Sequence, residues 1–165
     1  MTVLDKGKKM TLLVQGVQSG FGRVADSIGL DYSLMKSNIA LVKKIPDACA
    51  IASIGTVGDV RGGIAVSFDS DGFGACVSSM SGGMLAGSIN DDMSISCVGE
   101  MVNMIGGGVA IYGSGQGINL DVTPPQIFTG DRISQTYPTL VNWVSVPYLV
   151  RGTGKVYLNV FVSDE

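Results

Sequence analysis

The chain has 165 residues, a net charge of −3 and no histidine, with 45% hydrophobic and 15% charged residues. This length and composition predict a single folded domain over residues 1–165 and exclude a disordered chain. The missing histidine excludes Ser-His-Asp and Cys-His catalysis, His-ligated metals and phosphohistidine chemistry, and the lack of a basic stripe argues against nucleic-acid binding.

The first part of the chain predicts one helix followed by strands. Apolar residues recur at three- and four-residue steps over residues 10–30, which indicates a helix, although its glycines disfavour one. A strand is expected over residues 38–44. Two further strands, over 49–57 and 63–68, are joined by a glycine-containing turn and form a predicted hairpin.

Two more helices are expected in the middle of the chain. Ser70 or Asp71 is placed to cap a helix that reaches about Met80, where a Ser-Gly-Gly sequence would end it. Asp91 and Asp92 open a longer helix, because acidic residues are favoured at the positive end of the helix dipole. We expect this helix to reach about residue 112.

The last part of the chain predicts extended structure. Residues 113–117 read as a loop, and a short extended segment is expected over 126–129, after two prolines. Strands over 144–150 and 155–162 flank a glycine-containing turn, and the final strand alternates between two sets of side chains. The order of elements predicts an α+β fold in which helices pack on an antiparallel sheet.

The long helix after Asp91 has two faces, because successive residues advance by about 100°. The apolar stripe consists of Ile95, Val98, Val102, Ile105 and Val109. The opposite stripe consists of Ser96, Glu100, Asn103 and Gly107, flanked by Met93 and Met104.

By periodicity alone, an ordinary solvated helix back is the favoured explanation of such a polar stripe, because most amphipathic helices have a polar face. Two features favour a binding face instead. The stripe holds one charge where a solvated face usually holds several, and methionines are common at adaptable binding surfaces. A flat helical face of this kind suits docking to another protein better than enclosing a metabolite.

These residues resemble the signature of the CheC/CheX phosphatases. The spacing Ser96-x3-Glu100-x2-Asn103, followed by Pro125, is similar to the family pattern of an Asp or Ser, a Glu and an Asn on one helix. Three longer segments also look like family segments, in the same order along the chain: residues 58–68, 97–105 and 125–130.

The resemblance implies a CheC-like fold with one long active-site helix. It also implies a phosphatase that removes the phosphoryl group from the aspartate of a CheY-type receiver in chemotaxis or two-component signalling. In this family Asn103 would orient the attacking water, Glu100 would pair with the receiver's active-site lysine, and Ser96 would support the contact. The remaining expected partner-binding residues are Met93, Met104 and Gly107. No metal or cofactor is expected on this chain, since the receiver would supply Mg²⁺.

The helix expected over residues 10–30 contains no glutamate, so we expect one site per chain, which is the CheX pattern. CheX proteins are similar in forming homodimers through their sheets, and a homodimer is therefore expected here. Two alternatives stay open. One is a non-catalytic adaptor that binds a receiver or a flagellar-switch component. The other is a small-molecule site in the glycine-rich segments 113–117 or 152–155, although both segments read better as turns.

The sequence predicts a cytoplasmic protein without a membrane span or a disulfide framework. No apolar run reaches the roughly 18 residues that a span requires. The apolar run over residues 10–14 is too short for the core of a signal peptide. The cysteines at positions 49, 76 and 97 are odd in number and widely spaced, which favours buried free thiols over disulfides or a zinc site.

Overall fold

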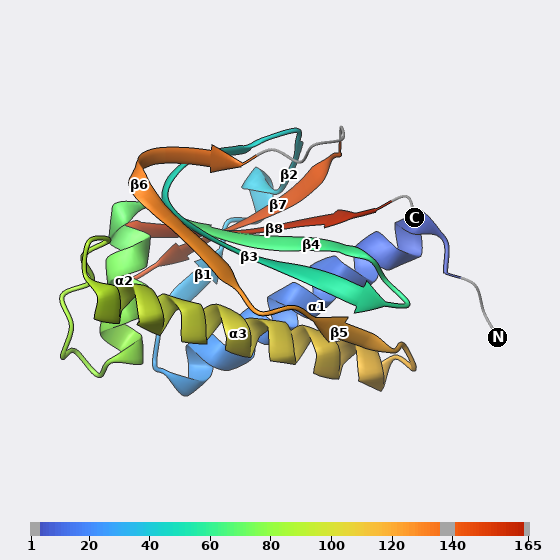
Figure 1. Cartoon of the computed structure of the whole chain (residues 1–165), viewed down its shortest axis with the longest axis horizontal. Helices are drawn as coiled ribbons and strands as arrows, with labels where there is room; N and C mark the ends of the chain where they lie inside the picture. The colour runs from blue at the N-terminus through green and yellow to red at the C-terminus, as the bar shows by residue number, and fades with distance from the viewer. Residues whose placement is uncertain (1–3, 136–140, 164–165) are drawn as a thin grey trace.

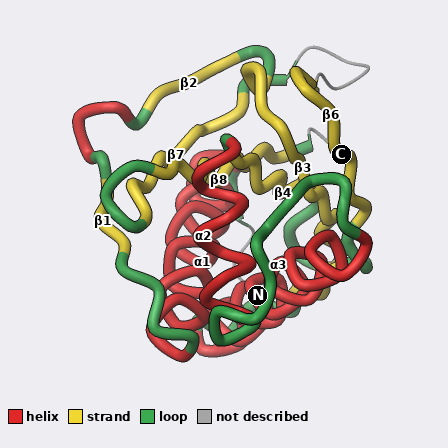
Figure 2. The backbone as a smooth tube through the Cα atoms, turned by 90° about the vertical axis from the view of Figure 1, so that its left-hand side faces the viewer, coloured by secondary structure: helices red, strands yellow, loops and turns green. Residues whose placement is uncertain are grey.

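The computed structural model describes residues 4–135 and 141–163. Within these residues, three α-helices pack on one face of an antiparallel sheet (Figure 1). Figure 2 shows the layers from the side, with the helices together beneath the strands. The helical segments are α1 (Lys6–Ser27), the short 3-10 helix η1 (Lys36–Asn38), α2 (Ser70–Met80) and α3 (Asp92–Gly115).

The sheet has the strand order β1-β7-β8-β4-β3-β5, and every pairing in it is antiparallel. At one edge of the sheet, β1 and β2 pair with different stretches of β7. At the other edge, β5 and β6 pair with different stretches of β3. The strands are β1 (Tyr32–Leu34), β2 (Ala40–Val42), β3 (Ile45–Gly58), β4 (Gly62–Phe68), β5 (Leu120–Val122), β6 (Gln126–Gln135), β7 (Trp143–Val150) and β8 (Gly154–Val162).

The predicted α+β class and both predicted hairpins are confirmed. The 49–57 and 63–68 segments form β3 and β4, and the last two strands form β7 and β8. The alternation in β8 also holds, because the even-numbered valines and Leu158 enter the main core beneath the helices. Phe161 faces the other side, where it joins Trp143 in a second, smaller core.

Several boundaries differ from the sequence prediction. The helix expected from residue 10 begins at Lys6, because Asp5 caps it by accepting a hydrogen bond from the Lys8 amide at 2.8 Å. The expected strand over 38–44 is only the three residues of β2, preceded by η1, and β1 was not predicted. The extended segment expected over 126–129 continues to Gln135, since β6 follows β3 to the position of Ile45.

The cap of α2 is Asp69, and neither Ser70 nor Asp71 has that role. One carboxylate oxygen of Asp69, Oδ1, accepts hydrogen bonds from the amides of Gly72 at 2.7 Å and Lys155 at 2.9 Å. The second of these bonds ties the start of α2 to the start of β8. Ser70 is already the first helical residue, so the capping position falls one residue earlier than predicted.

The helix α3 continues through Gly115, three residues beyond the predicted end, so the loop expected over 113–117 is partly helical. Among the described residues, α3 is the one helix whose length and apolar content would suffice to cross a membrane. One side of this helix enters the core beneath the sheet, where Val98, Met101, Val102, Ile105 and Val109 are all buried.

Candidate functional site

The start of α3 is fixed by a side-chain contact. Asp91 is the N-cap residue, and its Oδ2 accepts a hydrogen bond from the Ser94 hydroxyl at 2.8 Å. Ser94 is fully buried, so this contact ties the first turn to the core side of the helix. Further along α3, the side chains of Val98, Val102 and Ile105 are fully buried, and this apolar stripe turns the opposite side of the helix to solvent.

The solvent face of α3 carries the three polar residues that the sequence analysis grouped together. Ser96, Glu100 and Asn103 are all exposed, which confirms that they share the side away from the core. They come from successive turns of one helix, so their spacing is that of a single stripe. The predicted apolar stripe is also confirmed, with Ile95 half-buried at its edge.

The methionines of α3 divide between the two faces. Met93 is 65% exposed and Met104 is 39% exposed, so both flank the polar stripe as expected. Met101 was not assigned to either face by the sequence analysis, and it is fully buried. A buried apolar residue at this position was detectable from the sequence, since Met101 follows Val98 by three residues.

The glycine triplet at 106–108 does not interrupt the helix. A Cβ on Gly106 would lie 2.9 Å from the Ile54 Cδ1 atom, so this glycine lets α3 approach β3. Gly107 faces the other way, and a Cβ there would meet nothing within 4 Å. The polar stripe therefore ends in an open, side-chain-free position, as its spacing predicted.

Glu100 is the one charged residue of the polar stripe on α3. Asp92 and Glu100 are the charged residues of α3, and Asp92 lies in the first turn. In the part of the chain that the structure describes, no hydrogen bond or ion pair is formed by the side chains of Glu100 or Asn103. The Glu100 carboxylate and the Asn103 amide are thus both available to form hydrogen bonds with a partner.

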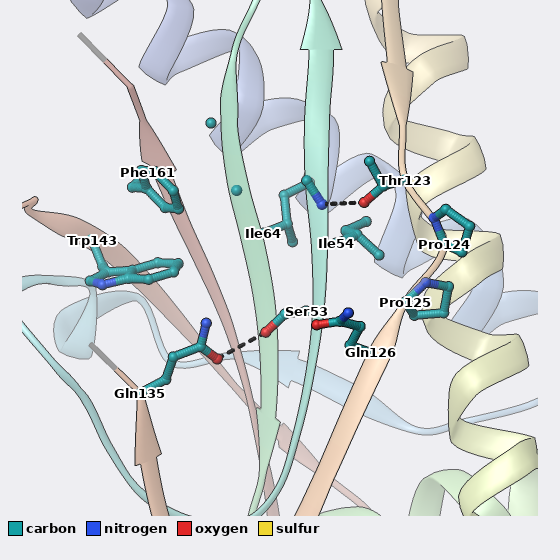
Figure 3. A pocket seen from close by; sticks show the side chains of 13 residues that line it. Ser53, Ile54, Ile64, Thr123, Pro124, Pro125, Gln126, Gln135, Trp143 and Phe161 are labelled. Carbon is teal, nitrogen blue, oxygen red and sulfur yellow. Dashed lines mark hydrogen bonds between the residues drawn. The ribbon is translucent and has the colours of Figure 1, made fainter. Parts of the chain in front are cut away.

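None of these residues lies in an enclosed cavity. A hollow of about 580 Å³ lies on the sheet face opposite the helices, where Trp143 and Phe161 form one wall and Pro124 and Pro125 the other (Figure 3). Ser53 donates a hydrogen bond to the Gln135 side chain across it at 2.8 Å. Glu100 and Asn103 lie outside this hollow, and both are exposed on the helix surface, where a macromolecule can reach them.

Two of the three thiols, those of Cys49 and Cys76, are buried. Burial raises the pKa of Cys76 to about 12, which keeps its thiol protonated. Burial also raises the pKa of Cys49, with a further contribution from the charge of Asp69. Over the described residues, no group of three or more Cys, Asp or Glu side chains is placed to hold a metal ion.

The glycine-rich segments do not form phosphate-binding loops. Residues 113–115 are the last turn of α3, and Gly117 belongs to the turn after it. Residues 151–153 form the tight turn between β7 and β8, in which Arg151 and Gly152 have positive φ. Neither segment is a loop between a strand and a following helix, which is the geometry that cradles a phosphate.

Comparison with known protein families identifies one family, and a curated protein with a related name also matches the chain. The family described as "Chemotaxis phosphatase CheX" matches residues 50–149, more than half of the chain. A protein named CheY-P phosphatase CheX, from Thermotoga maritima, is 29% identical over 114 residues, which cover 69% of this chain and 72% of that protein.

Solved structures share the fold. The chemotaxis protein CheX from Vibrio vulnificus superposes with a TM-score of 0.77 at 18% identity, covering 92% of this chain and 99% of that one. A CheX–CheY–BeF₃–Mg²⁺ complex from Borrelia burgdorferi gives a TM-score of 0.67 at 17% identity, covering 92% of this chain and 98% of that one. The predicted CheC-like fold is thereby confirmed.

Proposed function

Because the chain belongs to the CheX family of chemotaxis phosphatases, we propose that it hydrolyses the aspartyl phosphate of a CheY-type receiver domain. The Thermotoga relative is named as a phosphatase of phosphorylated CheY, and the Borrelia CheX was crystallised with CheY. The open polar face of α3 is the part of this chain that we assign to the reaction.

The carrying observation is that Glu100 and Asn103 lie together, exposed and without partners, on a helix face with little other charge. An aspartyl phosphate is an acyl phosphate and already reacts with water. Its hydrolysis requires alignment of the nucleophile and neutralisation of charge more than it requires a strong base. A protein without histidine can meet the alignment requirement with an amide.

In the proposed reaction the Asn103 amide orders a water molecule in line with the P–O bond to the receiver's aspartate. The water oxygen bonds to phosphorus, the P–O bond to the aspartate breaks, and the products are inorganic phosphate and a free carboxylate. Glu100 pairs with the receiver's lysine and fixes the docking register, while Ser96 contacts the rim. Mg²⁺ belongs to the receiver in this scheme, and the chain contributes no metal ligand.

The test is the rate of phosphate release from a phosphorylated receiver by the wild type and by Asn103→Ala. We expect a loss of roughly a hundredfold or more in rate, with receiver affinity mostly kept, as for removal of a group that positions the nucleophile. Asn119→Ala is the matched control, because Asn119 is exposed just beyond the far end of α3. An unchanged rate for Asn103→Ala would overturn the assignment.

The same assay separates the phosphatase from the adaptor alternative. An adaptor would bind the receiver and leave the lifetime of its phosphoryl group unchanged or lengthened. A phosphatase shortens that lifetime at concentrations far below that of the receiver. Binding by the wild type without acceleration would therefore replace the phosphatase with an adaptor of the same fold.

We further propose a cytoplasmic homodimer that forms through the sheet face opposite the helices. Val57 and Phe128 are 45% and 57% exposed on this face, and no charged side chain lines the adjoining hollow. Exposed apolar side chains around an uncharged hollow are typical of an interface. Sedimentation of Phe128→Asp should give a monomer at concentrations where the wild type is a dimer, and an unchanged mass would rule out this face.

A further inference from the structure

A shallow groove runs between α1 and α3, beside the polar stripe. It has a volume of about 280 Å³. We call it the α1–α3 groove, and its lining consists of Gly20, Arg23, Val24 and Ser27 from α1 and Met104, Gly107, Gly108 and Ile111 from α3. Ile111 is 58% exposed, so the apolar lining is open to solvent.

The floor of the groove is backbone, because glycines meet where the two helices touch. A Cβ on Gly20 would lie 2.6 Å from the Ile105 carbonyl oxygen, so no side chain fits between the helices there. Gly107 leaves the wall above this floor without a side chain. The missing side chains leave room for an apolar group from outside.

Along the axis of α3, the groove lies at the same height as Asn103, because the adjacent Met104 lines it. Gly16 contacts Val109 and Tyr112, while Gly20, one turn later on α1, contacts Ile105 and Gly108, one turn earlier on α3. The two helices therefore run antiparallel. One further turn brings Arg23 opposite Met104, with which it lines the groove, and Met104 is adjacent to Asn103 in sequence.

Arg23 is the charged residue of the groove, and it is exposed. Within the described residues its guanidinium forms no ion pair. It thus places an unpaired positive charge next to an apolar surface, one helix away from the negative charge of Glu100. A partner that matches both must present a carboxylate to Arg23 and a cation to Glu100.

We propose that the α1–α3 groove is the second half of the receiver-docking surface, where an apolar side chain of the receiver enters and Arg23 pairs with one of its carboxylates. This inference rests on the proposed function. A receiver that holds Mg²⁺ at its phosphoryl group must carry carboxylates there, because Mg²⁺ is bound through carboxylates together with phosphate oxygens. The groove adjoins the helix stripe that faces this acidic centre, and its single charge has the complementary sign.

The first test is charge reversal at Arg23. The probe is a CheY-type receiver of the same genome, activated with beryllofluoride and Mg²⁺ for binding and phosphorylated for kinetics. We expect Arg23→Glu to weaken binding and raise KM by about tenfold at low salt, with kcat at saturating receiver kept, and Arg23→Lys to restore most of the affinity. The difference from wild type should shrink as ionic strength rises. Lys8→Glu on the same helix is the control with the same change of charge.

The second test fills the groove. Gly107→Leu adds a side chain where nothing lies within 4 Å, so it should fold normally and raise KM by about tenfold or more. Gly115→Leu, in the last turn of α3, is the matched control, because a Cβ there also meets nothing within 4 Å. Circular dichroism and thermal unfolding of both variants confirm that the fold is intact.

The outcomes separate this inference from the proposed function. If Asn103→Ala abolishes hydrolysis while Arg23→Glu and Gly107→Leu keep the wild-type KM, the phosphatase stands and the groove is excluded from docking. If the two groove variants change only the self-association constant, the groove belongs to a second copy of this chain and the inference is overturned. If Asn103→Ala keeps the wild-type rate, the proposed function itself is wrong.

Discussion

Gly108 of α3 lies against Gly20 of α1 with no side chain between them: a Cβ on Gly108 would be 2.7 Å from the Gly20 Cα atom. This contact sets how closely the two helices approach. A Cβ on the neighbouring Gly107 would meet nothing within 4 Å. Gly108 is therefore required for the close contact between the helices, whereas Gly107 lies on the open side of α3.

These roles predict opposite effects of the same substitution. Gly108→Ala should lower the free energy of unfolding by about 1–3 kcal/mol, because the added methyl group forces the helices apart. Gly107→Ala should leave it unchanged or raise it by up to about 1 kcal/mol, since alanine favours the helix and nothing obstructs it. Urea unfolding followed by circular dichroism measures both. Equal effects would mean that α1 and α3 do not meet at this glycine pair.

Charge reversal at Glu100 should act on docking more than on chemistry. Glu100→Lys is expected to weaken binding of a beryllofluoride-activated receiver by about tenfold or more, because two cations would then face each other. Glu100→Gln should have a smaller effect. Asp131→Lys, an exposed substitution on β6, controls for the change in net charge. Unaltered affinity in Glu100→Lys would remove Glu100 from the docking contact.

Removal of the Asp69 carboxylate should destabilise the protein. Its Oδ1 atom accepts two amide hydrogen bonds, from Gly72 in α2 and Lys155 in β8, so Asp69→Ala should cost about 2–3 kcal/mol in unfolding free energy. Asp5→Ala removes one exposed capping bond from α1 and should cost about 1 kcal/mol. Chemical denaturation of the two variants gives the comparison, and an equal cost would show that the bond to β8 contributes nothing.

Thiol labelling should distinguish the three cysteines. Cys76 is fully buried, and burial raises its pKa to about 12, so its reactive thiolate is absent at pH 7 and still absent at pH 9. Cys97 is half-buried on α3 and should react first with iodoacetamide. Peptide mass spectrometry at both pH values tests this order. Early labelling of Cys76 in the native protein would contradict the packing of α2 on the sheet.

The two-sided character of α3 was readable from the sequence, because an α-helix fixes the angle between residues and the apolar stripe selects the buried side. The exposure of Ser96, Glu100 and Asn103 follows from that rule alone, and the structure confirms it. Their catalytic roles stay a prediction. The β7–β8 hairpin was equally readable, since its turn residues lie between two strongly apolar runs.

Long-range contacts decided the features that the sequence analysis missed. The predicted cap of α2 was Ser70 or Asp71, yet Asp69 has that role and also accepts a hydrogen bond from the amide of Lys155, 86 residues further on. The length of β6 depends on its pairing with β3, which no local pattern in β6 reveals. The second core around Trp143 and Phe161 likewise exists because distant strands meet on the far face of the sheet.

The sequence by itself determined the helix that carries the site and the direction in which Glu100 and Asn103 point, because both are local consequences of helical periodicity. Only the tertiary structure decided that Gly20 meets Gly108 and that Arg23 of α1 lies opposite Met104 of α3. That pairing depends on how two helices pack across a shared sheet, and the spacing of residues within either helix does not specify it.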